Sequence, residues 1–243
     1  MRLTFLGTGS AIPSERVQSG LLVEDEELVF DCGVGVMHNL GRSRVRIDDV
    51  GDFLLTHAHL DHVNDLPAIL KADWLLGRES INVYGPPGTA ETVNGLLDAY
   101  DYLKQKTNVE IEEFEPGDSF EVAGRSIETF PTQHSVPSTA YRVDDAFVYS
   151  GDTEPVEEIA EFADDSDVLV HECSFPDGME MSNHTHPSEL ARVVEGCSVN
   201  RVYMTHLFPH TTGKEDEMAE TVSQSFDGEV TVAEDMMTVE VVE

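Results

Sequence analysis

The sequence is poor in basic residues: 14 lysines and arginines stand against 48 aspartates and glutamates, which leaves a formal net charge of −34. The acids are spread along the whole chain and do not form a tail, which is typical of a solvated acidic surface. Such a surface repels a long polyanion at low salt. At about 1 M salt the Debye length is only ~3 Å, so the self-repulsion is screened. We therefore predict a halophilic type of surface that operates in a high-salt cytoplasm.

Cysteine is scarce as well. Cys32, Cys173 and Cys197 are the only three, and no two of them form a CxxC pair. This count argues against a disulfide framework and against a thiolate zinc site. No apolar run reaches the roughly 18 residues that a membrane-spanning helix needs. Met1–Pro13 contains neither a long apolar stretch nor a small-residue cleavage site. These absences predict a cytoplasmic protein with no signal peptide and no membrane partner.

No repeat, low-complexity tract or linker divides the chain, so we predict one domain over residues 1–243. Short apolar runs predict strands, and helical patterns lie between them. Strands are expected at Leu3–Leu6, Leu21–Val23, Leu28–Asp31, Phe53–Thr56, Ile81–Tyr84, Ser126–Phe130, Ala140–Val143, Phe147–Ser150, Val168–His171, Val202–Thr205 and Glu229–Val242. Helices are expected at Leu66–Leu76, Ala90–Leu103, Val156–Phe162, Ser188–Val194 and Glu215–Phe226. This interleaving fits a sheet-rich core with helices outside it.

One segment carries the clearest chemical signal. His57, His59, Asp61 and His62 lie within six positions, directly after the apolar run Phe53–Thr56. In extended backbone, residues i and i+2 point the same way, so His57 and His59 share a face. Asp61 and His62 follow as the chain turns into a helix and can face a second point. Two imidazoles for one ion, with a carboxylate and an imidazole for another, make a two-metal site plausible. A chance cluster of solvated residues is the alternative.

The segment His57–His62 has the pattern HxHxDH and resembles the signature of the metallo-β-lactamase superfamily. The resemblance extends along nearly the full chain and implies an α+β four-layer αββα sandwich. It also implies that His134, Asp152 and His206 complete the ligand set. One ion would be held by His57, His59, His134 and Asp152, and the other by Asp61, His62, His206 and Asp152. The implied cofactors are two divalent metal ions, zinc or alternatively manganese.

Other segments resemble the ribonuclease Z group of this superfamily: Gly7–Pro13 followed by Arg16, Asp31–Gly35, His171–Phe175 and Asn183–Pro187. The resemblance implies that hydroxide held by the two metals attacks phosphorus. It also implies that Glu172 orients His184, which gives a proton to the leaving oxygen. His186 is the alternative proton donor. The alternative role for Glu172 and His171 is a hydrogen bond to a metal ligand. His38 and His210 are assigned to the surface or to packing.

Two features depart from ribonuclease Z. Val34 and Val36 occupy positions where that group usually has Glu and Thr. Only 17 residues separate His134 from Asp152, and the long arm with which ribonuclease Z grips the tRNA elbow cannot fit there. The nearest basic cluster, Arg42, Arg44 and Arg46, is followed at once by acids. The resemblance is therefore to a short form without the tRNA exosite, and standard tRNA 3′-end cutting is not expected.

The sequence thus favours a two-metal phosphodiesterase, a ribonuclease Z-like nuclease acting on RNA, with Asp61, Glu172 and His184 as catalytic residues. One alternative is a small-molecule metallo-hydrolase whose substrate is a cyclic phosphodiester, a lactone or a thioester. Another is a non-catalytic metal-binding protein, although none of the seven implied ligands is missing. The expected partner is RNA or a small phosphodiester, and relatives that are often homodimers imply a homodimer. Neither the exact substrate nor the choice between endo- and exonuclease is fixed.

Overall fold

The computed structural model describes residues 1–78, 80–179 and 181–242. Its strands form two seven-stranded sheets. The first sheet has the order β14 (Thr238–Glu240), β1 (Arg2–Gly7), β2 (Gly20–Val23), β3 (Leu28–Phe30), β4 (Asp52–Leu54), β5 (Ser80–Gly85) and β6 (Asn108–Glu113). Strands β14 to β3 pair antiparallel, and β3 to β6 pair parallel.

The second sheet repeats this plan. Its order is β13 (Glu229–Val232), β12 (Arg201–Thr205), β11 (Val168–Glu172), β10 (Phe147–Tyr149), β9 (Thr139–Val143), β8 (Arg125–Pro131) and β7 (Ser119–Val122). Strands β7 to β10 pair antiparallel, and β10 to β13 pair parallel. Strands β10, β11 and β12 are mostly apolar and almost entirely buried, which suits the position of parallel strands between helices and a second sheet.

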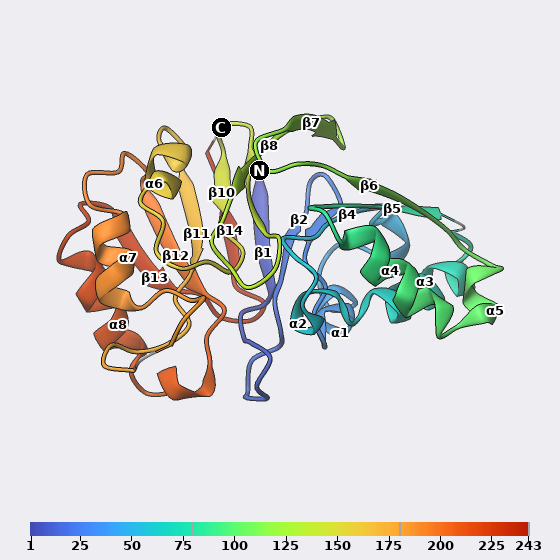
Figure 1. Ribbon diagram of the computed structural model, residues 1–243, viewed down its shortest axis with the longest axis horizontal. Coiled ribbons are helices and arrows are strands. Elements are labelled where there is room, and N and C mark those ends of the chain that lie inside the picture. Colours follow the sequence, from blue (N-terminus) through green and yellow to red (C-terminus); the bar gives the residue numbers. More distant parts are fainter. Residues whose placement is uncertain (79, 180, 243) are drawn as a thin grey trace.

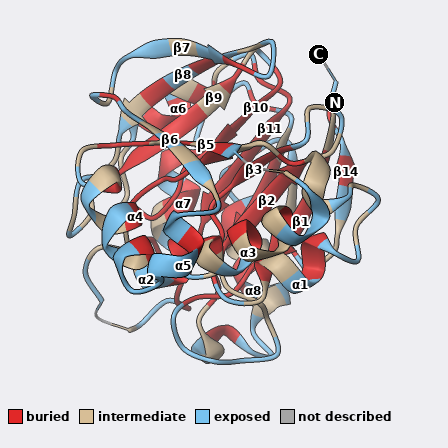
Figure 2. Cartoon of the chain, turned by 90° about the vertical axis from the view of Figure 1, so that its right-hand side faces the viewer, coloured by how far each residue is buried: buried red, intermediate tan, exposed pale blue. Residues whose placement is uncertain are grey.

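The helices lie on the outer faces of the two sheets, as Figure 1 shows. One apolar cluster joins the facing sides of the sheets, and buried residues run through the centre of the molecule in Figure 2. A second cluster joins the first sheet to α1 (Val36–Leu40), α3 (Leu66–Leu76), α4 (Thr89–Asp98) and α5 (Asp101–Lys104). A third joins the other sheet to α6 (Glu158–Ala163), α7 (Pro187–Val193) and α8 (Glu215–Ser223). The layers are helix, sheet, sheet and helix, which confirms the expected αββα sandwich.

Two element predictions are wrong. The expected strand Glu229–Val242 is two strands in different sheets, because the chain turns at residues 233–237, where Met236 has a positive φ of 66°. The expected helix Ala90–Leu103 is α4 and α5, since Tyr100 leaves helical geometry between them with φ −131° and ψ 63°. Among the described residues, no helix is long and apolar enough to cross a membrane.

Chain direction determines where polar residues gather. Parallel strands β3, β4, β10, β11 and β12 are each followed directly by polar or histidine-bearing segments. In open sheets with parallel strands, ligands bind outside the carboxyl ends of the strands. Two hydrogen bonds join the sheets near these ends: Tyr141 Oη donates to the Leu55 carbonyl at 2.7 Å, and the Thr139 amide donates to the Thr56 carbonyl at 3.1 Å. The two sheets therefore present their loops to one shared site.

Candidate metal centre

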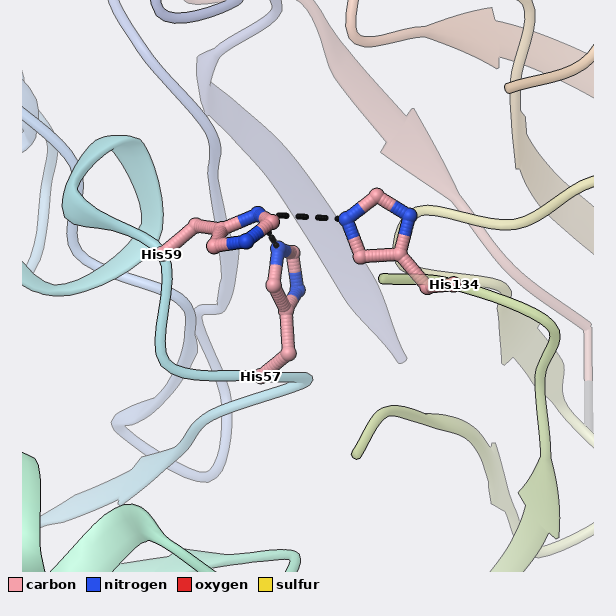
Figure 3. Close-up of side chains that lie close together, drawn as sticks. All are labelled: His57, His59 and His134. Atoms are coloured by element: carbon pink, nitrogen blue, oxygen red, sulfur yellow. Dashed lines mark hydrogen bonds between the residues drawn. The ribbon is translucent and has the colours of Figure 1, made fainter. Parts of the chain in front are cut away.

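Three histidine side chains converge at the first part of this site (Figure 3). His57 and His59 follow β4, and His134 follows β8. Nδ1 of His59 lies 3.0 Å from Nε2 of His57 and 3.1 Å from Nε2 of His134. Burial lowers the pKa of all three imidazoles, which favours their neutral, ligating form. The other nitrogen of His134, Nδ1, donates to the Asn183 carbonyl at 2.9 Å, so Nε2 keeps its lone pair for the site.

Asp152 lies between this group and a second one. Its Oδ2 is 3.8 Å from Nε2 of His57, 3.5 Å from Nε2 of His62 and 3.3 Å from Nε2 of His206. Asp61 completes the second group, with Oδ2 3.3 Å from Nε2 of His206. Burial raises the pKa of Asp152, but the imidazoles of His206 and His62 outweigh burial and hold that pKa well below its usual range. The carboxylate is charged and faces both groups.

The donor atoms fit two divalent cations. Nε2 of His62 and Oδ1 of Asp152 are buried and have no hydrogen-bond partner among the described residues. A buried polar atom without a partner is costly, and a bound cation removes that cost. Ligand atoms within 4.8 Å of one another occur in His57–His59–His134, in Asp61–His62–His206 and in His57–His62–Asp152. Imidazole and carboxylate ligands suit zinc and several other divalent metals.

Asp31 supports His62 on the side of the ring that faces away from the metal centre. No sequence pattern indicates this role. It follows β3 in left-handed geometry, with φ 56°, and it is fully buried. Its Oδ2 accepts hydrogen bonds from His62 Nδ1 at 2.8 Å and from Tyr149 Oη at 3.0 Å, while Oδ1 accepts from the Thr56 amide at 2.8 Å. Because Nδ1 of His62 donates to this carboxylate, Nε2 is the nitrogen that faces the site and can give up its proton when a cation binds.

Glycines let the backbone segments of the site approach one another. A Cβ at Gly33 would lie 2.0 Å from the carbonyl oxygen of Asp61, so the loop after β3 could not pack against α2 (Leu60–Val63). Gly151 has φ 59°, and a Cβ there would lie 2.7 Å from Cβ of Thr56. The Asp31–Gly35 and Ser150–Thr153 turns thus require glycine for a steric reason.

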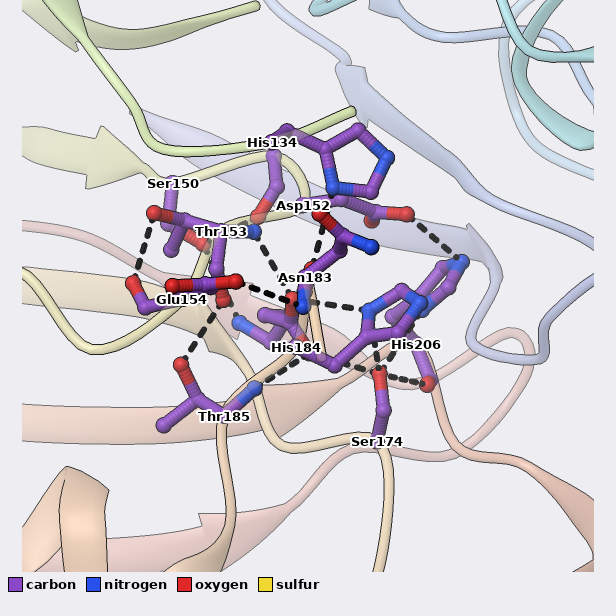
Figure 4. Close-up of polar contacts among 12 residues, drawn as sticks. His134, Ser150, Asp152, Thr153, Glu154, Ser174, Asn183, His184, Thr185 and His206 are labelled. Carbon is purple, nitrogen blue, oxygen red and sulfur yellow. Dashed lines mark hydrogen bonds and ion pairs between the residues drawn. The ribbon is translucent and has the colours of Figure 1, made fainter. Parts of the chain in front are cut away.

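Figure 4 shows a second set of polar contacts beside Asp152. His184 Nδ1 is 3.0 Å from Oε1 of Glu172, which ends β11 and is fully buried. The Glu172 carboxylate also accepts from the Thr153 amide at 2.7 Å and from Ser174 Oγ at 2.6 Å. Burial lowers the pKa of His184, but the Glu172 carboxylate outweighs burial and raises that pKa to about 9. This shift favours the protonated form of His184, which lies next to the centre in a group with Asp152 and His206.

Ser174 connects this pair to the metal-facing groups. Its Oγ lies 2.9 Å from Nδ1 of His206, which can donate to it and leave Nε2 for the site. Residue 206 itself has left-handed backbone, with φ 57°, which is uncommon outside glycine and recurs at functional sites. Sequence patterns give no signal for Ser174 beyond its place after Glu172, because its contact with His206 spans 32 residues.

The remaining histidines have other environments. His186 begins α7, where its Nδ1 lies 2.9 Å from Oε2 of Glu189 in a capping box, and it belongs to none of the groups of potential ligands. His171 is buried, and its Nδ1 donates to the carbonyl of Glu172 at 2.6 Å, not to a predicted ligand. His38 and His210 are exposed, as expected.

The interval between His134 and Asp152 contains β9 and β10, joined by a short turn at residues 144–146. The two strands pair antiparallel with Phe147 opposite Val143. This interval is a tight hairpin that packs in the second sheet. It therefore provides no arm that could reach a distant part of a substrate.

Comparisons with known proteins agree with this geometry. A family model described as a β-lactamase superfamily domain matches residues 26–207. A protein named ribonuclease Z from Mycobacterium marinum is 30% identical, over 99% of this chain and 99% of that protein. The crystal structure of human tRNase Z, short form, superposes with a TM-score of 0.80 at 24% identity and covers 100% of both chains. The metallo-β-lactamase fold protein YhfI from Bacillus subtilis gives a TM-score of 0.84 at 23% identity, over 98% of both chains. At identities of 23% and 24%, the similarity to these two structures shows the fold alone.

Proposed function

Because the chain belongs to the β-lactamase superfamily and to the ribonuclease Z-like group within it, and is thus a metal-dependent hydrolase, we propose that it is a two-metal phosphodiesterase that cleaves RNA. The observation that carries this proposal is the Glu172–His184 pair beside Asp152. A thioester has little need of such a proton donor, because a thiolate leaves readily without one. The oxygen that leaves phosphorus in RNA is a poor leaving group without a proton.

Under this proposal, His57, His59 and His134 hold one ion, Asp61, His62 and His206 hold the other, and Asp152 faces both. Two bound divalent ions, which we expect to be zinc, would neutralise the phosphate and supply hydroxide at neutral pH. The chain's own residues handle the second proton. Glu172 accepts from Nδ1 of His184, which fixes the tautomer and leaves the Nε2–H to protonate the leaving oxygen.

Glu172 is well suited to that positioning role, because donors from three segments hold it. The Thr153 amide comes from the turn after β10, Ser174 from the turn after β11, and the Thr185 amide, at 3.3 Å, from the segment before α7. The carboxylate therefore has one orientation, and the His184 ring that it holds stacks on His206 with ring centroids 5.3 Å apart. His186, bonded to Glu189, lacks this connection, which favours His184 as the acid.

Two substrates with different leaving groups test the proposal. We expect metal-dependent cleavage of labelled RNA and of bis(p-nitrophenyl) phosphate by the wild type, and loss of both in Asp61→Ala. His184→Ala should slow RNA cleavage by about 100-fold or more. It should slow p-nitrophenyl release far less, since p-nitrophenolate leaves without a proton. His186→Ala is the matched control and should resemble the wild type. If the wild type cleaves neither substrate with added zinc or manganese, the proposal is wrong.

A second candidate function is hydrolysis of a small cyclic phosphodiester. The short hairpin between β9 and β10 favours it, because a small substrate requires no distant grip. Parallel assays with a 2′,3′-cyclic nucleotide and with a 3′-extended RNA discriminate between the two. A kcat/KM that is larger for the cyclic nucleotide would assign the site to small molecules.

A further inference from the structure

A pocket with a volume of about 270 Å³ lies between α3, α4 and α5, on the outer face of the first sheet. Its lining includes Asn64, Lys71, Leu96, Tyr100, Tyr102 and Leu103. Asn64, which caps the carboxyl end of α2, is two residues from His62, so the pocket begins beside the metal-facing segment. Figure 1 shows α2 at the start of this helical layer and α5 at its far end. A chain that leaves the metal centre over α2 would meet this pocket next.

The polar groups of the pocket are a lysine, an amide and the hydroxyl groups of two tyrosines. Nζ of Lys71 lies 3.9 Å from the ring centroid of Trp74 and 5.0 Å from that of Tyr102. Among the described residues, Lys71 forms no ion pair, although the chain carries 48 acids. The aromatic rings hold its ammonium group through cation–π contacts and leave its hydrogen-bonding capacity free. The exposed side-chain amide of Asn64 can both donate and accept.

The surface around the pocket differs in charge from the rest of the chain. Residues 64–78 and 95–106 contain four bases and four acids, whereas the whole chain contains 14 and 48. Three of the four lysines, Lys71, Lys104 and Lys106, are in these two segments. Tyr100 and Tyr102 are about half exposed, at 45% and 52%. A polyanion thus meets less repulsion here than the net charge suggests, and it meets two accessible aromatic faces.

We propose that this α3–α5 pocket binds one unpaired nucleotide of the RNA substrate, next to the scissile phosphate. The proposal rests on the proposed function and specifies its substrate as RNA that is single-stranded near the cut. Single-stranded nucleic acid is bound by aromatic stacking together with positive charge along the backbone. Here Tyr100 or Tyr102 offers the stacking face, Lys71 faces the phosphate, and the Asn64 amide faces the base edge. Because the interval between His134 and Asp152 provides no arm, such a local contact would be the main contact with the RNA outside the metal centre.

A second copy of the chain is the competing occupant. A stable interface buries about 800 Å² on each partner, whereas this pocket is a concave site for one small group. The pocket's chemistry therefore favours a nucleotide, and the oligomeric state of the variants decides between the two.

Trp74 is the only tryptophan of the chain and its ring contacts Lys71 of the pocket, so its fluorescence responds to a change at that lysine. We expect adenosine 5′-monophosphate to change the fluorescence of the metal-loaded protein in a saturable way. Tyr102→Ala and Lys71→Ala should each weaken binding by about tenfold. Tyr102→Phe keeps the ring and Lys106→Ala removes a lysine outside the pocket, so both should bind within about twofold of the wild type. No saturable signal, or equal loss in Lys106→Ala, overturns the proposal.

Kinetics provide the second test. For a 3′-extended single-stranded RNA, Tyr102→Ala should raise KM by about tenfold and change kcat little. The ratio of kcat/KM for RNA to that for bis(p-nitrophenyl) phosphate should fall accordingly. An unchanged ratio overturns the pocket's role but leaves the nuclease standing. A wild type that cleaves neither substrate overturns the nuclease, and the fluorescence titration still decides the pocket. If sedimentation shows a dimer that Tyr102→Ala splits, the face belongs to a second copy and the proposal is wrong.

Discussion

Asp31→Asn is expected to weaken metal binding, although Asp31 is not itself one of the candidate metal ligands. The carboxylate accepts from His62 Nδ1, from Tyr149 Oη and from Thr56. Asparagine has nearly the same shape, and its oxygen can still accept from the Thr56 amide. Its NH₂ group then faces Nδ1 of His62 at the position where Oδ2 now accepts. Two donors cannot pair, so the proton of His62 moves to Nε2.

That shift removes the lone pair that His62 directs toward Asp152, where Nε2 lies 3.5 Å from Oδ2. Loss of such a supporting contact typically lowers metal affinity 10- to 100-fold, which is about 1.4–2.7 kcal/mol. We expect the site of Asp61, His62 and His206 to weaken by this amount and the site of the other three histidines to change less. Chelator competition and the metal content after gel filtration measure the two affinities.

Tyr149→Phe is the matched control. It removes one hydrogen bond to Asp31 and leaves the proton of His62 in place. The free energy of unfolding should fall by about 1.5 kcal/mol, as for other hydrogen bonds to a charged group, while both metal affinities stay near those of the wild type. If Asp31→Asn binds two ions as tightly as the wild type does, the assignment of the tautomer of His62 is refuted.

Three further predictions concern stability. Burial raises the pKa of Asp73 to about 7. Because the pKa of this carboxyl is lower in the unfolded chain, the folded state keeps its proton to a higher pH. Stability is therefore lost as pH rises from about 4 to 7. Asp73→Asn should therefore stabilise the protein by about 2 kcal/mol at pH 8 and by little at pH 4. The value of about 2 kcal/mol is half the free energy that corresponds to the full pKa shift, which allows for screening by solvent. Equal denaturant midpoints of the wild type and the variant at pH 8 would contradict this. Gly33→Ala should cost about 3 kcal/mol, because its Cβ meets the Asp61 carbonyl, and should also release metal; a crystal structure with α2 in place and two bound ions would argue against it. Dialysis from about 2 M to about 0.1 M KCl should lower the melting temperature sharply, because the net charge of −34 is then no longer screened. An unchanged melting curve by circular dichroism would contradict the high-salt interpretation.

Much of the fold could be predicted because its strands are short, apolar and bounded by polar turns. Leu66–Leu76 is predicted and observed with the same bounds, since Pro67 marks its start and Gly77 its end. Strands β6 and β7 were missed because Asn108–Glu113 and Ser119–Val122 alternate exposed acids with few apolar residues. Edge strands with such composition lack the apolar run that marks a buried strand.

The candidate ligands could be predicted because they belong to a motif with fixed spacing. The residues that hold these ligands in place could not be predicted. HxHxDH names four residues at once, and the family pattern adds three. Asp31, Ser174 and Asn183 act through contacts across 31, 32 and 49 residues, which no local pattern encodes. Asp31 lies at the end of a predicted strand and in a segment that resembles ribonuclease Z, but neither observation indicates its contact with His62. The roles of the ligands remain predictions that metal binding will decide.

The candidate site draws its residues from both ends of the chain, and this affects when activity can appear. His57 to His62 follow β4, whereas Asp152 follows β10 and His206 follows β12. A chain emerging from the ribosome exposes four of the seven candidate ligands early, but the last arrives only after β12. If the proposed function holds, an unfinished chain cannot cleave RNA, and neither can one truncated before His206. Under the proposed function, the order of the elements would therefore prevent cleavage of ribosomal RNA by a chain that is still being made.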